Sequence, residues 1–161
     1  MSNADMLVRI LVAAALGGIV GIERELRDQP AGFRTHMLVA IGACLFTIVG
    51  AFGFQQFTGG TDAQRIQADL TRVASQVVVG IGFLGGGTIL RHGATVRGLT
   101  TAATLWVTAA VGVAVAMGLY FVATATSILA VFALAALKPI ERRFMRGMRQ
   151  EDEPPSAMSP D

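Results

Sequence analysis

Long apolar runs separated by short polar segments make up most of the chain. A transmembrane helix needs about 20 apolar residues, and the uncharged run over 99–137 would be about 58 Å long as one helix, nearly twice the hydrocarbon core. We therefore expect this run to fold as two spans with a turn at Met117 and Gly118. The pattern predicts an all-α integral membrane protein, a bundle of about five transmembrane helices over residues 6–22, 37–57, 73–90, 100–116 and 119–137.

The run from Val73 to Leu90 combines the absence of charge with an unusual number of glycines. Each glycine destabilises a helix by about 1 kcal/mol relative to alanine, so a span that only sits in lipid has no use for them. Small residues let helix backbones approach closely in membranes, and successive glycines can also break a helix beside a cavity. We interpret the run as a central packing element, a broken functional helix, or both. Its candidate packing or cavity residues are Ser75, Gln76, Gly80, Gly82, Gly85, Gly86 and Gly87.

The basic residues predict the orientation of these spans. In a five-span arrangement, ten of the 13 Lys and Arg residues fall in the segments after the first, third and fifth spans. Positive segments stay in the cytoplasm, which predicts an outer N-terminus and an inner C-terminus. Residues 138–150 place arginines beside apolar positions at helical spacing, typical of a basic amphipathic helix on the cytoplasmic surface. The acidic segment 151–161 is predicted to be disordered.

Composition supports membrane insertion. Charged residues make up 15% of the chain, against about 25% in soluble domains, and mean hydropathy is +0.58. The sequence Gly80 to Gly85 matches G-x-G-x-x-G, but it lies in an uncharged membrane-length run instead of a soluble βαβ unit, so we treat it as a false match. No nucleophile–base pair is apparent. We therefore expect no enzyme activity. We also expect no nucleic-acid partner.

Three carboxylates, those of Glu23, Glu25 and Asp28, gather after the first span. Oxygen ligands of this kind can hold Mg²⁺ through its waters. However, Arg24 and Arg27 stand among them, and local ion pairing is the preferred interpretation. We assign no cofactor and keep Mg²⁺ as an open alternative.

Polar residues of two segments are expected to meet on the cytoplasmic face. Anchoring in the membrane needs only positive charge, whereas recognition uses the planar fork of arginine. We predict that function lies at this cytoplasmic mouth, formed by Glu23, Arg24, Glu25, Arg34, Thr35, Arg97, Thr100 and Thr101.

Four segments together resemble the membrane domain of the MgtC/SapB family. They are G-I-E-R-E at 21–25, A-G-F-R-T-H-M-L-V-A-I-G-A at 31–43, the glycine-rich run at 75–90, and V-R-G-L-T-T-A-A-T-L-W-V-T-A-A-V-G at 96–112. The family pattern usually reads G-F-L-G-A-G in the third segment. Gly86 replaces that alanine here, which would loosen the third span.

The resemblance implies a multi-pass protein of the bacterial inner (cytoplasmic) membrane, tied to adaptation to low magnesium, acid or host stress. In the best-known virulence members the protein restrains the ATP synthase and carries a further ACT-like domain. The sequence shows no such domain, and we expect a short, SapB-type member. Two hypotheses stay open: a regulator that contacts another membrane protein such as the ATP synthase, and a small ion or solute transporter or channel using the third span. Further expected partners are membrane lipid and a second copy, most simply in a homodimer.

Overall fold

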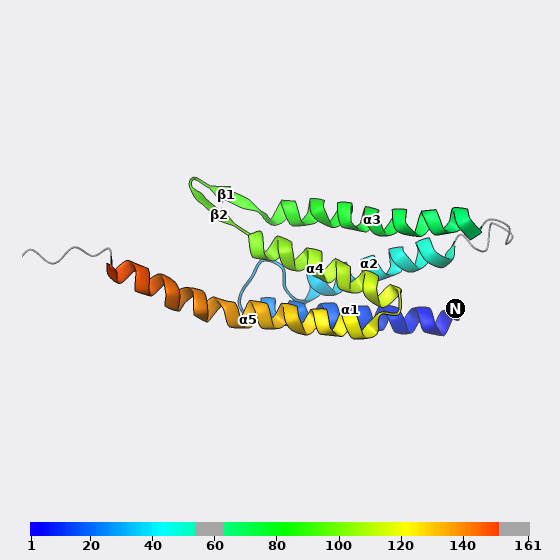
Figure 1. The fold of residues 1–161 in the computed structure, drawn as a ribbon, viewed down its shortest axis with the longest axis horizontal. Coiled ribbons are helices and arrows are strands. Elements are labelled where there is room, and N and C mark those ends of the chain that lie inside the picture. The colour runs from blue at the N-terminus through cyan, green and yellow to red at the C-terminus, as the bar shows by residue number, and fades with distance from the viewer. Residues whose placement is uncertain (54–62, 152–161) are drawn as a thin grey trace, which may run out of the picture.

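The computed structural model describes the backbone of residues 1–53 and 63–151, and the side chains of these ranges outside 63–71 and 137–151. Within them, long helices run up and down along one common axis (Figure 1). The helices are α1 (Asn3–Glu25), α2 (Phe33–Ile48), α3 (Ala63–Thr88), α4 (Leu99–Ala116) and α5 (Tyr120–Glu151). A π-helical turn, Val49–Gly53, extends α2. The expected helical bundle is therefore confirmed.

Helix α1 begins and ends at residues suited to those positions. The Ser2 hydroxyl accepts a hydrogen bond from the Asp5 amide at 3.2 Å, and the Asp5 carboxylate accepts one from the Ser2 amide at 3.0 Å. This capping box satisfies amides that lack helical partners. The helix ends at Glu25, ahead of a turn in which Asp28 has a φ of 52°.

Glycines on α1 allow α2 to pack closely against it. A Cβ at Gly17 would lie 2.6 Å from the Cβ of Ala40, and one at Gly21 would lie 2.7 Å from the Cα of Phe33. On the other side of α2, a Cβ at Gly112 of α4 would collide with the Ala40 carbonyl oxygen. Small side chains therefore set the spacing of α1, α2 and α4, as is common for helices in membranes.

The apolar interior lies among these helices and extends to α5. Small and branched side chains from α1, α2, α4 and α5 form its larger cluster. They are Ala13, Leu16, Ala40, Cys44, Ile48, Val111, Val115, Ala116 and Ala123. The single cysteine is thus a buried, free thiol.

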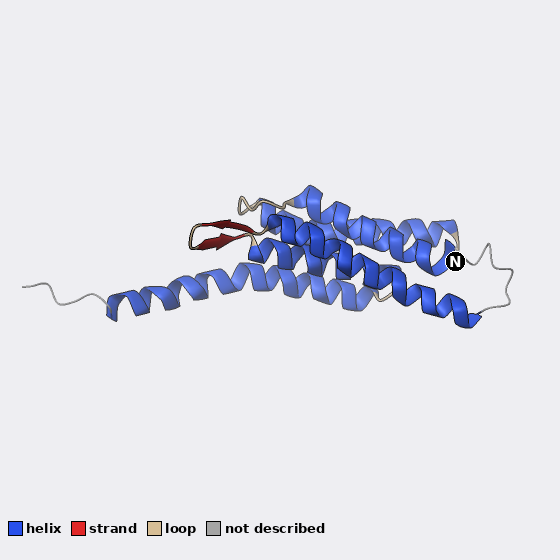
Figure 2. Cartoon of the chain, turned by 90° about the horizontal axis from the view of Figure 1, so that it is seen from above, coloured by secondary structure: helices blue, strands red, loops and turns tan. Residues whose placement is uncertain are grey.

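Helix α3 contains the glycine-rich run, and it is neither a broken helix nor a central packing element. It continues through Gly85–Gly87 to Thr88, so the glycines do not break it. It lies along the outside of the bundle, over α4 and α2 (Figure 2). A Cβ at Gly82 or Gly86 would meet no atom within 4 Å. Helix α3 is therefore not the central packing element, because the interior is already filled from α1, α2 and α4.

The bounds of α3 also differ from the expected span. The helix begins at Ala63, ten residues before Val73, and it ends before Leu90, which belongs to a strand. Its first ten residues are mostly polar, and 16 residues of the apolar run remain helical.

A β-hairpin stands where a loop was expected between the third and fourth spans. Strands β1 (Leu90–His92) and β2 (Thr95–Arg97) pair antiparallel, with Arg91 opposite Val96. Gly93 takes a φ of 60° at the first central position of the two-residue turn, which glycine tolerates. Gly98 has a φ of 88° and closes the hairpin against the Thr88 carbonyl oxygen, where any side chain would collide.

The turn between α4 and α5 contains Gly118, at the position expected from the sequence, with a φ of 80°. Arg9 of α1 reaches this turn and donates a hydrogen bond to the carbonyl of Ala116, where α4 ends. A cation at a helix C-terminus is favourable. The segment 138–150 continues α5 instead of forming a separate helix. The side chains of this segment, on which the expected amphipathic pattern depends, and the tail 152–161 lie outside the described residues.

Three segments in the described ranges are long and apolar enough to cross a membrane, by length and composition: Asn3–Glu25, Phe33–Phe52 and Leu99–Ala116. Helix α5 adds a shorter apolar stretch, Tyr120–Ala136. Large apolar side chains cover the outside, including Phe83 and Phe121, which are 84% and 86% exposed. Lipid is the solvent that such a surface requires.

Candidate functional site

Arg24 is the centre of a buried polar cluster at the end of the bundle where α1 ends. The residue is only 3% exposed, and its Nη2 donates to the Gln29 side-chain oxygen at 3.0 Å and to the Thr101 hydroxyl at 3.3 Å. Arg24 therefore ties the end of α1 both to the following turn and to the start of α4. One terminal nitrogen serves both partners, because Nη2 of arginine carries two N–H groups that point in different directions.

Glu23 lies beside Arg24 and is 9% exposed. Its Oε1 is 2.5 Å from Nε of Arg27, one helical turn later. This contact is an ion pair without hydrogen-bond geometry, since neither carboxylate oxygen accepts a hydrogen bond from the described residues. The expected local pairing of carboxylates with arginines is thus present for Glu23 and Arg27.

Glu25 has a different task. Its carboxylate accepts a hydrogen bond from the Phe33 amide at 2.7 Å, at the start of α2. Gly32, the residue before α2, offers no side chain to cap the helix. Glu25 therefore supplies from α1 the acceptor and the negative charge that a helix N-terminus favours.

His36 completes the cluster from α2. It is fully buried, and its Nδ1 lies 3.0 Å from the Gly32 carbonyl oxygen, while Nε2 has no partner among the described residues. A Cβ at Gly21, one turn before Arg24, would lie 3.0 Å from the Cβ of His36. The absence of a side chain at Gly21 is what admits the imidazole to this position. We refer below to Glu23, Arg24, His36 and Thr101 as the polar cluster.

The structure separates the predicted cytoplasmic mouth into two groups. Glu23, Arg24 and Thr101 are buried together, and Glu25 caps α2 nearby. The remaining members are exposed around them: Arg34 and Thr35 on the first turn of α2, Arg97 on β2, and Thr100 on the first turn of α4.

Sequence reasoning missed His36 and Gln29. The sequence signal for His36 was its position four residues after Gly32, at the start of an uncharged run, where a polar ring needs a partner.

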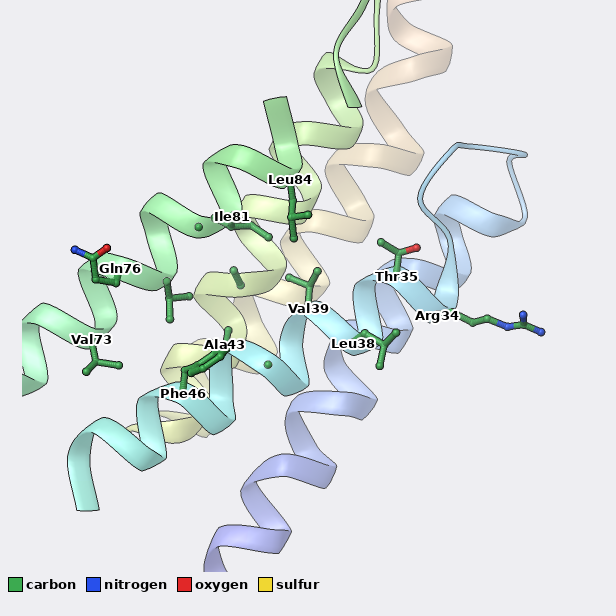
Figure 3. A pocket seen from close by; sticks show the side chains of 14 residues that line it. Arg34, Thr35, Leu38, Val39, Ala43, Phe46, Val73, Gln76, Ile81 and Leu84 are labelled. Carbon is green, nitrogen blue, oxygen red and sulfur yellow. The ribbon is translucent and has the colours of Figure 1, made fainter. Parts of the chain in front are cut away.

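An apolar groove lies between α2 and α3 on the outside of the bundle (Figure 3). Its volume is about 670 Å³, and Ala43 and Ala109 line it between the two helices. Gly42 and Gly80 keep it open, since a Cβ at either position would meet nothing within 4 Å. The lining residues are Arg34, Thr35, Leu38, Val39, Gly42, Ala43, Phe46, Val73, Gln76, Val77, Gly80, Ile81, Leu84 and Ala109. We call this space the α2–α3 groove.

The remaining candidates on α3 have varied surroundings. Ser75 donates to the carbonyl of Arg72 at 2.7 Å, within its own helix, instead of bonding a neighbouring helix. Gln76 lines the groove. Gly85 faces Ala102 of α4, with 3.5 Å available to a Cβ, whereas Gly82, Gly86 and Gly87 face open space.

Comparison with known proteins identifies relatives of this sequence. The sequence model of the MgtC family matches residues 10–143, which include α2, α3, α4 and the hairpin in full, most of α1 and the apolar part of α5. The chain belongs to the MgtC family. No solved structure matches it.

Several curated relatives are similar to this member of the MgtC family. "Putative magnesium transporter YhiD" of Escherichia coli K12 is 37% identical over 143 residues, covering 89% of this chain and 65% of that protein. "Protein MgtC" of Brucella abortus is 44% identical over 128 residues, covering 80% and 49%. The protein slr0014 of Synechocystis is 45% identical over 136 residues, covering 84% and 53%. The chain thus spans about half to two thirds of the length of these relatives.

The segments that resemble the MgtC family converge on the polar cluster. Arg24 comes from 21–25, His36 from 31–43 and Thr101 from 96–112. In the described ranges, no group of three or more His, Cys, Asp or Glu side chains could hold a metal ion. The cluster joins charged and hydrogen-bonding groups from three helices, α1, α2 and α4.

Proposed function

We propose that this MgtC-family protein is a non-enzymatic regulator in the bacterial inner membrane, serving adaptation to low magnesium, acid or host stress. It acts by contacts with another membrane protein, such as the membrane sector of the ATP synthase. The observation that carries the proposal is the polar cluster at one end of the bundle, surrounded by exposed Arg34, Arg97 and Thr100.

The arrangement suits recognition for a physical reason. Burying charged groups costs free energy unless they are paired, so a cluster with unpaired atoms has to be held by the surrounding fold. Arg24 fixes α1 to α4, and Glu25 fixes α1 to α2. The exposed arginines at this end therefore lie on helices whose ends are held in place. A partner protein can recognise them by their fixed positions.

The decisive experiment replaces arginines without removing charge. We expect Arg34→Lys and Arg97→Lys to abolish survival in low magnesium or acid while the protein remains inserted at the parental level, because lysine lacks the planar fork. Arg91→Lys is the matched control, since Arg91 is exposed on the same hairpin and its Nε bonds only the carbonyl of Gly93 at 3.0 Å. Parental survival of both test variants would show that these arginines are only topological anchors.

The proposed orientation has five crossings, an outer N-terminus and the polar cluster in the cytoplasm. It is supported by the up-and-down course of the helices and by the concentration of basic residues at one end. Single cysteines at Thr61 and Gln150, in a Cys44→Ser background, should be labelled from opposite sides of the membrane. Labelling from one side contradicts five crossings.

We further propose a homodimer, because two-fold dimers are the commonest closed assembly and a bundle this small exposes much of each helix. The protein mass of the detergent complex, measured by light scattering across a wide concentration range, should equal two chains. A mass of one chain throughout would overturn this.

A magnesium transporter is the second candidate, since a relative carries that word in its name. Purified protein in vesicles loaded with a magnesium-sensitive dye tests it. Flux that depends on the protein and is stopped by Gly80→Leu would favour transport through the α2–α3 groove over the regulatory role.

A further inference from the structure

The α2–α3 groove is an apolar space that opens on the outside of the bundle. Its walls include Leu38, Phe46 and Leu84, which are 62%, 65% and 52% exposed. The side chains of Val39 and Ile81 point into the space between the two helices (Figure 3). In a membrane, such a groove faces hydrocarbon chains, not water.

The length of the groove corresponds to one leaflet. On α2 it extends from Arg34 to Phe46, which is twelve helical steps, or about 18 Å at a rise of 1.5 Å per step. The hydrocarbon core is about 30 Å thick, so one acyl layer is about 15 Å deep. The groove therefore runs from the end of α2 near the polar cluster to just beyond the midplane.

The lining of the groove suits a lipid chain. Apart from Arg34, Thr35 and Gln76, the described residues that line it are apolar, so their side chains offer an occupant no further hydrogen-bond partner. A hydrocarbon chain needs none, and its head group would lie at the Arg34 end.

The mouth of the groove carries a positive charge. Arg34 extends away from the groove at this end, and Thr35 adds a hydroxyl (Figure 3). Arg34 makes no hydrogen bond or ion pair with the described residues, and none of the described residues that line the groove is Asp or Glu. Arginine binds phosphate oxygens in a bidentate manner, and basic sites between helices on the cytoplasmic side bind anionic lipid head groups.

We propose that the α2–α3 groove binds an anionic phospholipid of the cytoplasmic leaflet, with one acyl chain between α2 and α3 and the phosphate on Arg34 and Thr35. Gly42 and Gly80 provide the space for the chain. The choice of leaflet rests on the orientation proposed above, but the site itself does not. Binding would hold α3, on which Ile81 and Gly85 are the buried residues of the described part, against the rest of the bundle.

The test measures lipid retained by the purified full chain in detergent, using native mass spectrometry after addition of phosphatidylglycerol or phosphatidylcholine with identical acyl chains. We expect the parent to retain phosphatidylglycerol about tenfold more than phosphatidylcholine. Arg34→Gln should remove this preference while both lipids still bind. Gly80→Leu should lower retention of both lipids at least about tenfold, since the leucine fills the groove.

Gly82→Leu is the matched control on the same helix, because Gly82 also faces open space but does not line the groove. It should retain lipid like the parent, and all variants should elute and melt like the parent. Equal retention by Gly80→Leu and the parent would overturn the proposal. A change of oligomeric mass in Gly80→Leu, without loss of lipid, would instead make the groove a protein interface and also overturn it.

Discussion

The glycines of α1 and those of α3 have opposite surroundings. A Cβ at Gly17 would lie 2.6 Å from the Cβ of Ala40 and 2.8 Å from the carbonyl oxygen of His36, whereas one at Gly82 or Gly86 would meet nothing within 4 Å. Both helices have glycines four residues apart. This glycine spacing shows that another helix can pack closely against the backbone. It does not show which helix packs there, or whether that helix belongs to the same chain.

The difference follows from what each helix offers besides glycine. Helix α1 also carries Ala13, Leu16 and Val20, which are buried among α2, α4 and α5, and it ends in the polar cluster. On the described part of α3, Ile81 is the buried large apolar side chain. Helix α3 is therefore held to the bundle by fewer buried groups, and its glycine face stays available to lipid or protein.

The largest expected effect is that of Gly17→Leu. The new side chain would collide with the α2 backbone at the His36 carbonyl, which cannot move without disturbing the polar cluster. Overpacking of this kind typically costs about 1–3 kcal/mol and sometimes more. We expect loss of most inserted, monodisperse protein by size-exclusion chromatography. Gly82→Leu should be present at the parental level, and equal loss in both variants would break the comparison.

An intermediate effect is expected for Gly85→Leu. A Cβ at Gly85 would make ordinary contact with Ala102, at 3.5 Å, but the rest of a leucine side chain would push α3 away from α4. We expect a lower melting temperature and partial loss of the proposed dimer, with insertion retained. Gly85→Ala is the control and should behave like the parent. A melting temperature unchanged by leucine would show that α3 is not held by this contact.

Arg24 provides the polar counterpart of the comparison. Arg24→Lys keeps the charge but carries its nitrogen on a shorter side chain, which should weaken or remove the hydrogen bonds to Gln29 and Thr101. Each lost hydrogen bond to a charged group is worth about 1.5–3 kcal/mol before relaxation. We expect a lower melting temperature for Arg24→Lys and no change for Arg34→Lys, which is exposed. Equal melting temperatures would mean that the polar cluster does not stabilise the junction of α1 and α4.

The smallest effect is a gain. Gly82→Ala and Gly86→Ala place a methyl group in open space and remove glycine from a helix, which should stabilise α3 by about 0.5–1 kcal/mol each. Hydrogen exchange of the α3 amides in detergent should slow accordingly. Faster exchange would show that these two positions are covered in the assembled protein and would favour an interface there.

Some features could be predicted from residues close together in the chain. The apolar runs predicted a helical membrane bundle, and the carboxylates among arginines predicted local pairing, found between Glu23 and Arg27. The hairpin was missed because its strands are only three residues long and carry no alternation that distinguishes them from a loop. The contact of Arg24 with Thr101 joins residues 77 positions apart, and no pattern of neighbouring residues predicts it.

By itself, the sequence determined that this chain forms apolar helices and that it resembles the MgtC family. It also determined at which ends of the helices the positive charge lies. These properties depend on composition and on neighbours within a few residues, which act in any environment. Only the tertiary structure decided that Gly17 and Gly21 pack while Gly82 and Gly86 do not, that His36 is buried beside Arg24, and that Gly42 and Gly80 face one groove. Each of these depends on which helix faces which, and that is settled by the packing of side chains across the whole bundle.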